Sequence, residues 1–190
     1  IAQKNRVFSL GDSTADGCLI RAEFSLFEEL ATRAVGWELD FCQFSHATAP
    51  FFIEQIAGSS VMISRAVLPA RFYQQGAVAR GYRTVSLLAS GAGPQSWRWC
   101  GESVTSHSLL VMPLGGDFES VSSEGLDTLH LTLPIRLLSD MAESHFGQPL
   151  HRLMPDERVF CANGGAPLFR LRHLLQKYAP GQGGTQEAMN

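Results

Sequence analysis

The stretch from Phe51 to Pro134 most limits what this chain can fold into, because it consists almost entirely of short strand-like runs. Clusters of Gly, Pro or Ser separate these runs, for example Ser90-Gly91-Ala92-Gly93-Pro94. Closely spaced short strands with frequent turns indicate an antiparallel sandwich or barrel. The intervals are too short for the crossover helices that a parallel sheet needs. The predicted strands are Phe52–Ile56, Ser60–Val67, Arg71–Gln75, Tyr82–Ala89, Ser96–Cys100, Ser108–Met112, Asp117–Ser122 and Leu126–Leu133.

Helical patterns flank this strand region on both sides. Ser25-Leu26-Phe27-Glu28 has the spacing of a capping box and predicts a short helix, and the alternation that starts at Trp37 predicts a first strand. After the strands, the apolar spacing predicts one helix from Pro134 that ends at Gly147, and a second helix that begins near Pro167. The chain is therefore predicted to be mainly β, with an N-terminal helix and two C-terminal helices.

The last residues have the composition of a linker. Pro180 to Gln186 contains mostly Gly, Pro and polar residues, which is typical of a flexible connection. We therefore expect that residues 180–190 lead to a further part attached beyond Asn190.

Charge and cysteine usage narrow the function classes. The 190 residues contain 15 Lys and Arg against 18 Asp and Glu, a net charge of −3, whereas a domain whose main task is to grip nucleic acid carries a basic excess. The four cysteines form no CxxC pair, so we predict free thiols in a reducing compartment. No apolar run is long enough to cross a bilayer and no signal peptide opens the chain, so we expect a cytoplasmic protein without membrane contact.

Motifs of known enzyme chemistry are missing from the sequence. It contains no GxSxG elbow, no P-loop, no GxGxxG before a helix and no HExxH. No two of the six histidines lie two, three or four residues apart, as the ligands of a strand-borne or helix-borne metal site usually do. We therefore predict no catalytic residues, no metal and no cofactor.

Several side chains are candidate ligand contacts in the interior of the β domain. Trp97 and Trp99 alternate with Arg98, so both indoles lie on one sheet face, where they fill the core, form a wall for a bound molecule, or do both. His130 stands in the opposite phase from three leucines, so it either faces outward or offers a polar contact to a ligand inside. The full set of candidate ligand-binding residues is Phe72, Gln74, Trp97, Trp99, Met112, Phe118 and His130.

Four arginines are candidate contacts for an anionic ligand. They are Arg65, Arg71, Arg80 and Arg83, on adjoining predicted strands. A guanidinium group binds phosphate or carboxylate well, but a solvated strand face is the simpler interpretation of this cluster.

The segment Ser108–Ser122 (SLLVMPLGGDFESVS), followed by Leu126–Pro134 (LDTLHLTLP) and a helix, resembles the N-terminal sensor domain of AraC/XylS-type bacterial transcription regulators. The earlier helix, the strand at Gly36-Trp37 and the Trp97-Arg98-Trp99 strand are also similar, so the resemblance extends from about Glu23 to Ala179. In that family a cupin-like barrel is followed by a helical hairpin, a linker and a C-terminal pair of helix-turn-helix motifs.

The resemblance implies a specific organisation. Residues 1–134 would hold the N-terminal helix and a cupin-like antiparallel β-barrel (a double-stranded β-helix) that binds an effector. Residues 135–179 would form a helical hairpin for dimerisation, and residues 180–190 the linker toward a DNA-binding domain that this chain lacks. The predicted dimerisation residues, which would pack across a two-fold axis or against the first helix, are Leu168, Leu171, Leu175 and Tyr178.

The leading hypothesis is an effector-binding and dimerisation domain of an AraC-type regulator. It would form a homodimer, bind a small molecule, and contact DNA only through the missing domain, and His130 to Pro134 would couple the ligand to the helices. Two alternatives stay open at this point. One is a cupin-type enzyme, an isomerase or dioxygenase, and the other is a dimerisation module without ligand whose barrel is fully packed.

Overall fold

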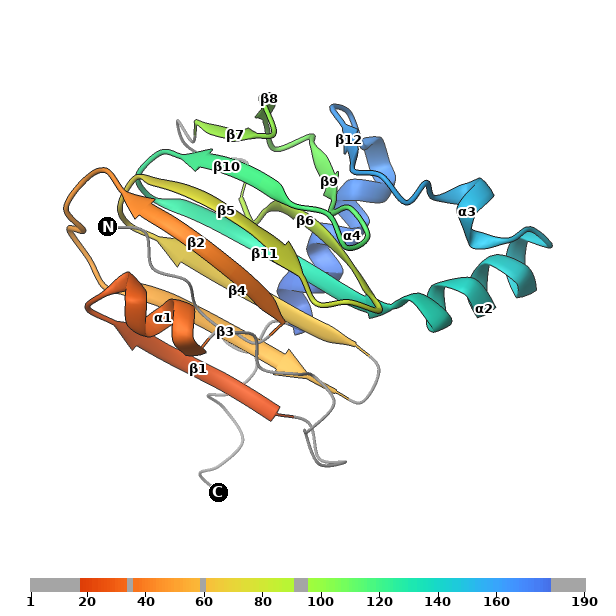
Figure 1. Cartoon of the computed structure of the whole chain (residues 1–190), viewed down its shortest axis with the longest axis horizontal. Coiled ribbons are helices and arrows are strands. Elements are labelled where there is room, and N and C mark those ends of the chain that lie inside the picture. Colours follow the sequence, from red (N-terminus) through yellow and green to blue (C-terminus); the bar gives the residue numbers. More distant parts are fainter. Residues whose placement is uncertain (1–17, 34–35, 59–60, 91–95, 179–190) are drawn as a thin grey trace, which may run out of the picture.

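The chain folds into two antiparallel β-sheets that face each other, with helices at the periphery (Figure 1). The computed structural model describes residues 18–33, 36–58, 61–90 and 96–178. One sheet has seven strands in the order β1-β3-β4-β11-β6-β9-β12, and the other has five in the order β2-β5-β10-β7-β8. The predicted mainly β, antiparallel fold class is confirmed, and within the described residues the two sheets face each other without closing into one continuous sheet.

The strands mostly follow the predicted runs. Their bounds are β1 Cys18–Phe24, β2 Trp37–Gln43, β3 Phe51–Ala57, β4 Met62–Leu68, β5 Phe72–Val78, β6 Tyr82–Leu88, β7 Trp97–Trp99, β8 Glu102–Val104, β9 Leu109–Val111, β10 Phe118–Ser122, β11 Leu126–Pro134 and β12 Val159–Cys161. The helices are α1 Phe27–Arg33, α2 Ile135–Phe146, α3 Leu150–Leu153 and α4 Gly165–Tyr178. None of the described helices is long and apolar enough to cross a membrane.

An aromatic cluster under α1 forms one part of the core between the sheets. Phe27 of α1 lies with its ring centroid 4.3 Å from those of Phe41 and Phe72, and 5.7 Å from that of Phe51. Aromatic pairs at these separations gain energy beyond the burial of their surface. Phe27 therefore fixes the short helix to strands of both sheets, and Leu30 and Ala31 of the same helix are buried in this core as well.

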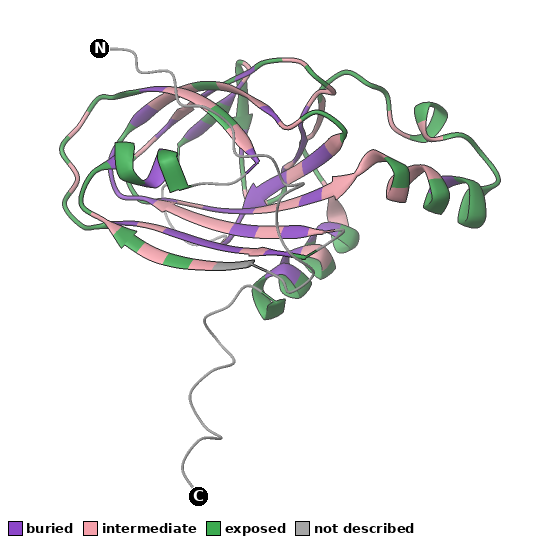
Figure 2. Cartoon of the chain, turned by 60° about the horizontal axis from the view of Figure 1, so that its bottom comes forward, coloured by how far each residue is buried: buried purple, intermediate pink, exposed green. Residues whose placement is uncertain are grey.

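The amphipathic helix α4 covers the outer face of the seven-stranded sheet (Figure 2). Leu168 and Leu175 are buried in a cluster with Leu87 and Leu129 of the sheet. The predicted dimerisation residues Leu168 and Leu175, with Leu171 beside them, are thus packed on their own chain. They cover the leucines on the outward face of the sheet, which offer the nearest apolar surface. Tyr178 stays exposed.

Polar side chains of α4 fasten the helix to the ends of strands. Arg172 Nε donates to the carbonyl oxygen of Leu88 at 2.9 Å, and Arg172 Nη2 donates to the carbonyl oxygen of Ser106. Gln176 Nε2 donates to the carbonyl oxygen of Ala89 at 2.6 Å. Burial lowers the pKa of Arg172 from its usual value. These hydrogen bonds fix the position of α4 along the sheet, in addition to the apolar contact of its leucines.

The helix α2 does not form the predicted hairpin with α4. It continues from the end of β11 and extends away from the sheets with most of its surface exposed (Figures 1 and 2). Gly147 ends it in a left-handed conformation, with φ of 61°. Between α2 and α4, the chain returns to the seven-stranded sheet through α3 and β12. Arg83 holds the loop before β12 by donating to the carbonyl oxygens of Pro155, Asp156 and Glu157. The predicted linker at 180–190 lies outside the described residues.

The packing of α4 predicts very unequal losses of stability for two neighbouring leucines. Leu175→Ala removes a side chain that is 2% exposed and should lower the free energy of unfolding by about 3 kcal/mol. Leu174→Ala alters a side chain that is 49% exposed and should change it by less than about 0.5 kcal/mol. Urea denaturation of both variants checks this, and equal losses would contradict the packing of α4 on the sheet.

Candidate functional site

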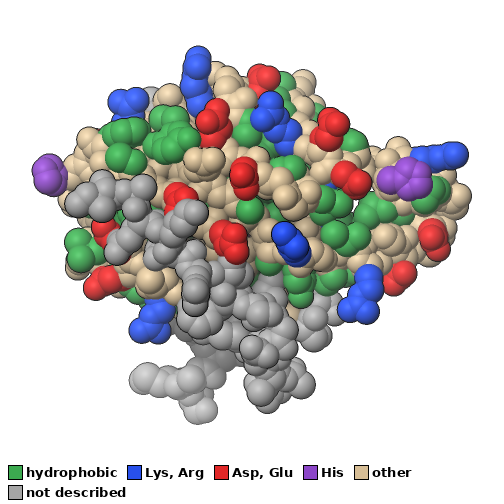
Figure 3. All heavy atoms as spheres, in the orientation of Figure 1, with side chains coloured by type: hydrophobic (Ala, Val, Ile, Leu, Met, Phe, Trp, Pro, Cys, Tyr) green, Lys and Arg blue, Asp and Glu red, His purple; other side chains and the backbone are tan. Residues whose placement is uncertain are grey.

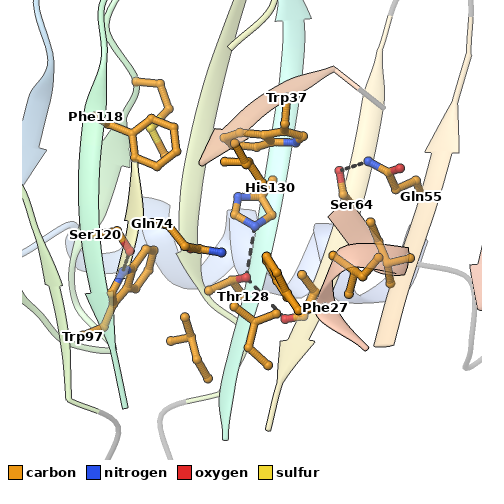
Figure 4. A pocket seen from close by; sticks show the side chains of 17 residues that line it. Phe27, Trp37, Gln55, Ser64, Gln74, Trp97, Phe118, Ser120, Thr128 and His130 are labelled. Carbon is orange, nitrogen blue, oxygen red and sulfur yellow. Dashed lines mark hydrogen bonds between the residues drawn. The ribbon is translucent and has the colours of Figure 1, made fainter. Parts of the chain in front are cut away.

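The inward-facing side chains of the two sheets, together with Phe27 and Leu30 of α1, line a partly open cavity with about 70 Å³ of space (Figure 4). Because side chains alternate along a strand, every second residue of β3, β4, β10 and β11 points into it. Its walls are mostly apolar and aromatic. The lining residues are Phe27, Leu30, Trp37, Leu39, Ile53, Gln55, Ser64, Ala66, Leu68, Gln74, Trp97, Met112, Phe118, Ser120, Leu126, Thr128 and His130.

His130 lies in the wall formed by β11, and both of its ring nitrogens have partners. Nδ1 is 2.7 Å from the hydroxyl of Ser86, and Nε2 is 3.0 Å from the hydroxyl of Thr128. The Thr128 hydroxyl donates to the carbonyl oxygen of Ala66 at 3.3 Å, so it accepts from Nε2–H, and Nδ1 accepts from Ser86. The imidazole is therefore a fixed, neutral part of the wall, with Trp37 edge-on at 5.1 Å between ring centroids.

Burial lowers the pKa of His130 from its usual 6.5 to about 4. A charged imidazolium would lose its hydration there, and no carboxylate is among the residues that line the cavity to compensate for it. Protonation would also remove the acceptor at Nδ1 that the Ser86 hydroxyl uses. His130 is thus neutral at physiological pH.

Two further polar groups stand side by side on the opposite wall. Ser120 of β10 and Gln74 of β5 are direct cross-strand partners. The Ser120 hydroxyl accepts a hydrogen bond from the Trp97 indole N–H at 2.9 Å. The Gln74 carboxamide points into the cavity and has no hydrogen-bond partner among the described residues (Figure 4). Gln74 is therefore the polar group of this wall that is available to a bound molecule.

The structure brings five of the predicted ligand-binding residues to the cavity. Gln74, Trp97, Met112, Phe118 and His130 all line it, so His130 faces inward. The leucines of opposite phase on β11 face outward because α4 covers that side. Whether a ligand touches these five residues remains a prediction.

Phe72 and Trp99 lie elsewhere. Phe72 is fully buried in the aromatic cluster with Phe27. It lies two residues before Gln74 on the same face of β5, at the end of the strand that is nearer to α1. Trp99 is also fully buried, and its indole N–H has no hydrogen-bond partner within the described part of the chain. Neither residue lines the cavity, so for both a place in the packed core replaces the predicted wall position.

Sequence reasoning missed Trp37, Ser120 and Thr128 as lining residues. Thr128 stands two residues before His130 on β11, so the period of the strand could have identified it once an inward His130 was accepted. Ser120 and Trp37 depend on strand pairing, which a single sequence does not specify.

Three of the four arginines are engaged outside the cavity, and Arg80 is exposed. Arg65 makes two hydrogen bonds to Asp127, at 3.0 and 2.8 Å, and Arg83 is used by the loop before β12. Arg71 lies over the ring of Phe44. Among the described residues no three His, Cys, Asp or Glu side chains come together as a metal site would require.

Comparison with solved structures finds a similar fold. The "AraC-like transcriptional activator CuxR" aligns with 85% of this chain at a TM-score of 0.53 and 14% sequence identity. The chain spans 58% of the length of that protein. Neither the family models nor the curated proteins give a match to the sequence. The resemblance to an AraC-type sensor domain is therefore confirmed at the level of the fold.

The buried neutral His130 predicts a specific loss of stability in acid. Its folded pKa lies below the unfolded value, so only the unfolded state takes up the proton between pH 6.5 and pH 4. This residue should therefore lower the free energy of unfolding by about 3 kcal/mol as the pH falls through that window, with no further loss below it. Urea denaturation at several pH values should show this loss of unfolding free energy in the wild type and not in His130→Asn. The exposed His107→Asn is the control and should keep it.

Proposed function

We propose that this chain is the effector-binding domain of an AraC-like transcription regulator and that it holds a small molecule in the cavity between its sheets. One observation carries the proposal: an apolar cavity contains the carboxamide of Gln74, which has no hydrogen-bond partner among the described residues. Gln74 is half-buried, so its carboxamide lies between apolar walls and can still be reached by a ligand that enters the cavity. A ligand that hydrogen-bonds to it there gains both orientation and affinity. The fold that the chain shares with a transcriptional activator supports the same assignment.

DNA contact belongs, in this proposal, to a separate domain of the cytoplasmic regulator. The chain has a net charge of −3, and Figure 3 shows acidic and basic side chains interspersed over the face it displays. Such a surface lacks the basic stripe that follows a phosphate backbone. The chain also spans only 58% of the length of the similar activator.

The two alternatives receive less support. A cupin-type isomerase or dioxygenase needs an acid–base pair or a metal. Among the described lining residues His130 is the only His, Asp, Glu, Lys or Arg, and both of its nitrogens are engaged. We therefore propose that the chain is not an enzyme. A ligand-free dimerisation module should have a filled interior, and the space beside Trp97 argues against it.

Filling the cavity should abolish ligand binding without unfolding the chain. A thermal-shift screen against sugars, amines, fatty and aromatic acids, small neutral compounds and cyclic nucleotides should find a compound that stabilises the wild type by roughly 2.7 kcal/mol at 100 times its Kd. Ala66→Met extends a side chain into the cavity and should remove that shift. Val67→Met, on the next residue of the same strand and outside the cavity, should retain it. A shift that survives in Ala66→Met would place the ligand elsewhere.

We further propose that the protein forms a homodimer through the outer side of α4. Leu174 and Tyr178 are spaced four residues apart on this helix and are 49% and 57% exposed, so they form an apolar stripe that faces away from the sheet. The buried leucines of the same helix stay with their own chain in this arrangement.

The double variant Leu174→Glu/Tyr178→Glu should be a monomer in sedimentation velocity, at a concentration where wild type is a dimer. His173→Glu adds charge to an exposed position of the same helix and should remain dimeric. A monomeric wild type, or a double variant that stays dimeric, would overturn this interface.

A further inference from the structure

We propose that the cavity selects a compact, uncharged molecule of single-ring size whose polar edge pairs with the Gln74 carboxamide. This inference rests on the proposed function and specifies the class of effector. Charge, hydrogen bonding and shape of the cavity each restrict that class.

The described part of the wall contains no formal charge. None of the described residues that line the cavity is Asp, Glu, Lys or Arg. The alternation of the strands places the charged residues on the other face: Glu54 lies between the inward Ile53 and Gln55 and faces Arg21 at 3.7 Å, and Arg65 pairs with Asp127. An ionised ligand would therefore lose its hydration inside the cavity without gaining a counter-charge.

His130 does not supply the missing charge or a free hydrogen-bonding group. Its ring is neutral, and Ser86 and Thr128 occupy both nitrogens. What it offers to the cavity is a flat ring surface next to Trp37. A ligand that needs a proton donor or acceptor must find it on the other wall.

That wall offers a donor and an acceptor together. The Gln74 carboxamide carries both an N–H₂ and a C=O, and neither has a partner among the described residues. Ser120, directly opposite on β10, accepts from Trp97 and keeps its own hydroxyl hydrogen. A neutral amide or a similar group with an adjacent donor and acceptor is the complement of this arrangement.

The size of the cavity limits the part of an effector that lies between the sheets. Its space of about 70 Å³ is roughly half of an engineered apolar cavity of about 150 Å³ that binds benzene. A single ring is thus the largest group that fits between the sheets after small movements of the side chains. Flat walls from Phe27, Trp37, Trp97 and Phe118 favour a planar ring over a branched chain.

Three probes of one ring each separate these requirements in a titration of the 190-residue protein, followed by two-dimensional amide NMR. Benzamide is neutral and carries a donor and an acceptor, benzoate has nearly the same shape with a negative charge, and toluene has neither polar group nor charge. We expect benzamide to bind about tenfold more tightly than toluene, and benzoate to be weaker than benzamide by at least about tenfold.

Two adjacent glutamines of β5 provide matched variants. Gln74→Leu should reduce the preference for benzamide over toluene to within about twofold, while toluene still binds, which also shows that the variant is folded. Gln75 is exposed on the opposite face of the strand, so Gln75→Leu should keep the full preference.

The outcomes distinguish this inference from the proposed function. If benzoate binds as tightly as benzamide, or if Gln74→Leu keeps the preference, the uncharged class is overturned while a ligand-binding cavity stands. If all three probes fail but a compound of another class gives a shift that Ala66→Met removes, the class is again overturned and the effector-binding function stands. If neither the probes nor the screen find a ligand, both are overturned.

Discussion

Strand β11 lies between β4 and β6 in the seven-stranded sheet, and both of its faces are covered. Leu129 faces outward and packs under α4, while Thr128 and His130 face the cavity. Because the middle of the strand is largely shielded from water on both sides, its polar groups need partners within the chain. The hydrogen bonds between Ser86, His130 and Thr128 meet this requirement, so the same strand supports the outer helix and a polar inner wall.

Much of the β domain could be predicted from the sequence because its longer strands are separate apolar runs with turn residues between them. The strands β1, β8 and β12 were not predicted. β8 and β12 contain three residues each, too few to show a period, whereas the alternation of Ile20, Ala22 and Phe24 could have identified β1. The predicted hairpin of the C-terminal helices is also wrong. An amphipathic pattern shows that a helix has a buried face, but it does not show which surface covers that face.

The candidate site could be predicted where the alternation of side chains along one strand is enough to tell which residues face inward. Trp97 and Gln74 line the cavity because they share an inward face with other predicted core residues. The orientation of His130 could not be decided from its leucine neighbours, since on a strand covered on both faces apolar residues mark either side equally well. The core positions of Phe72 and Trp99 depend on contacts between strands distant in sequence.

The two faces of β11 have a consequence for how such a domain can diversify. Residues Thr128 and His130 contribute to the composition of the cavity, and Leu129 and Leu131 contribute to the docking of α4. Because the two sets alternate along one strand and face different surroundings, a substitution in one set removes no side-chain contact that the other set makes. Ligand preference can therefore change during evolution while α4 stays docked on the sheet. Selection can act on ligand recognition and on helix packing as separate traits.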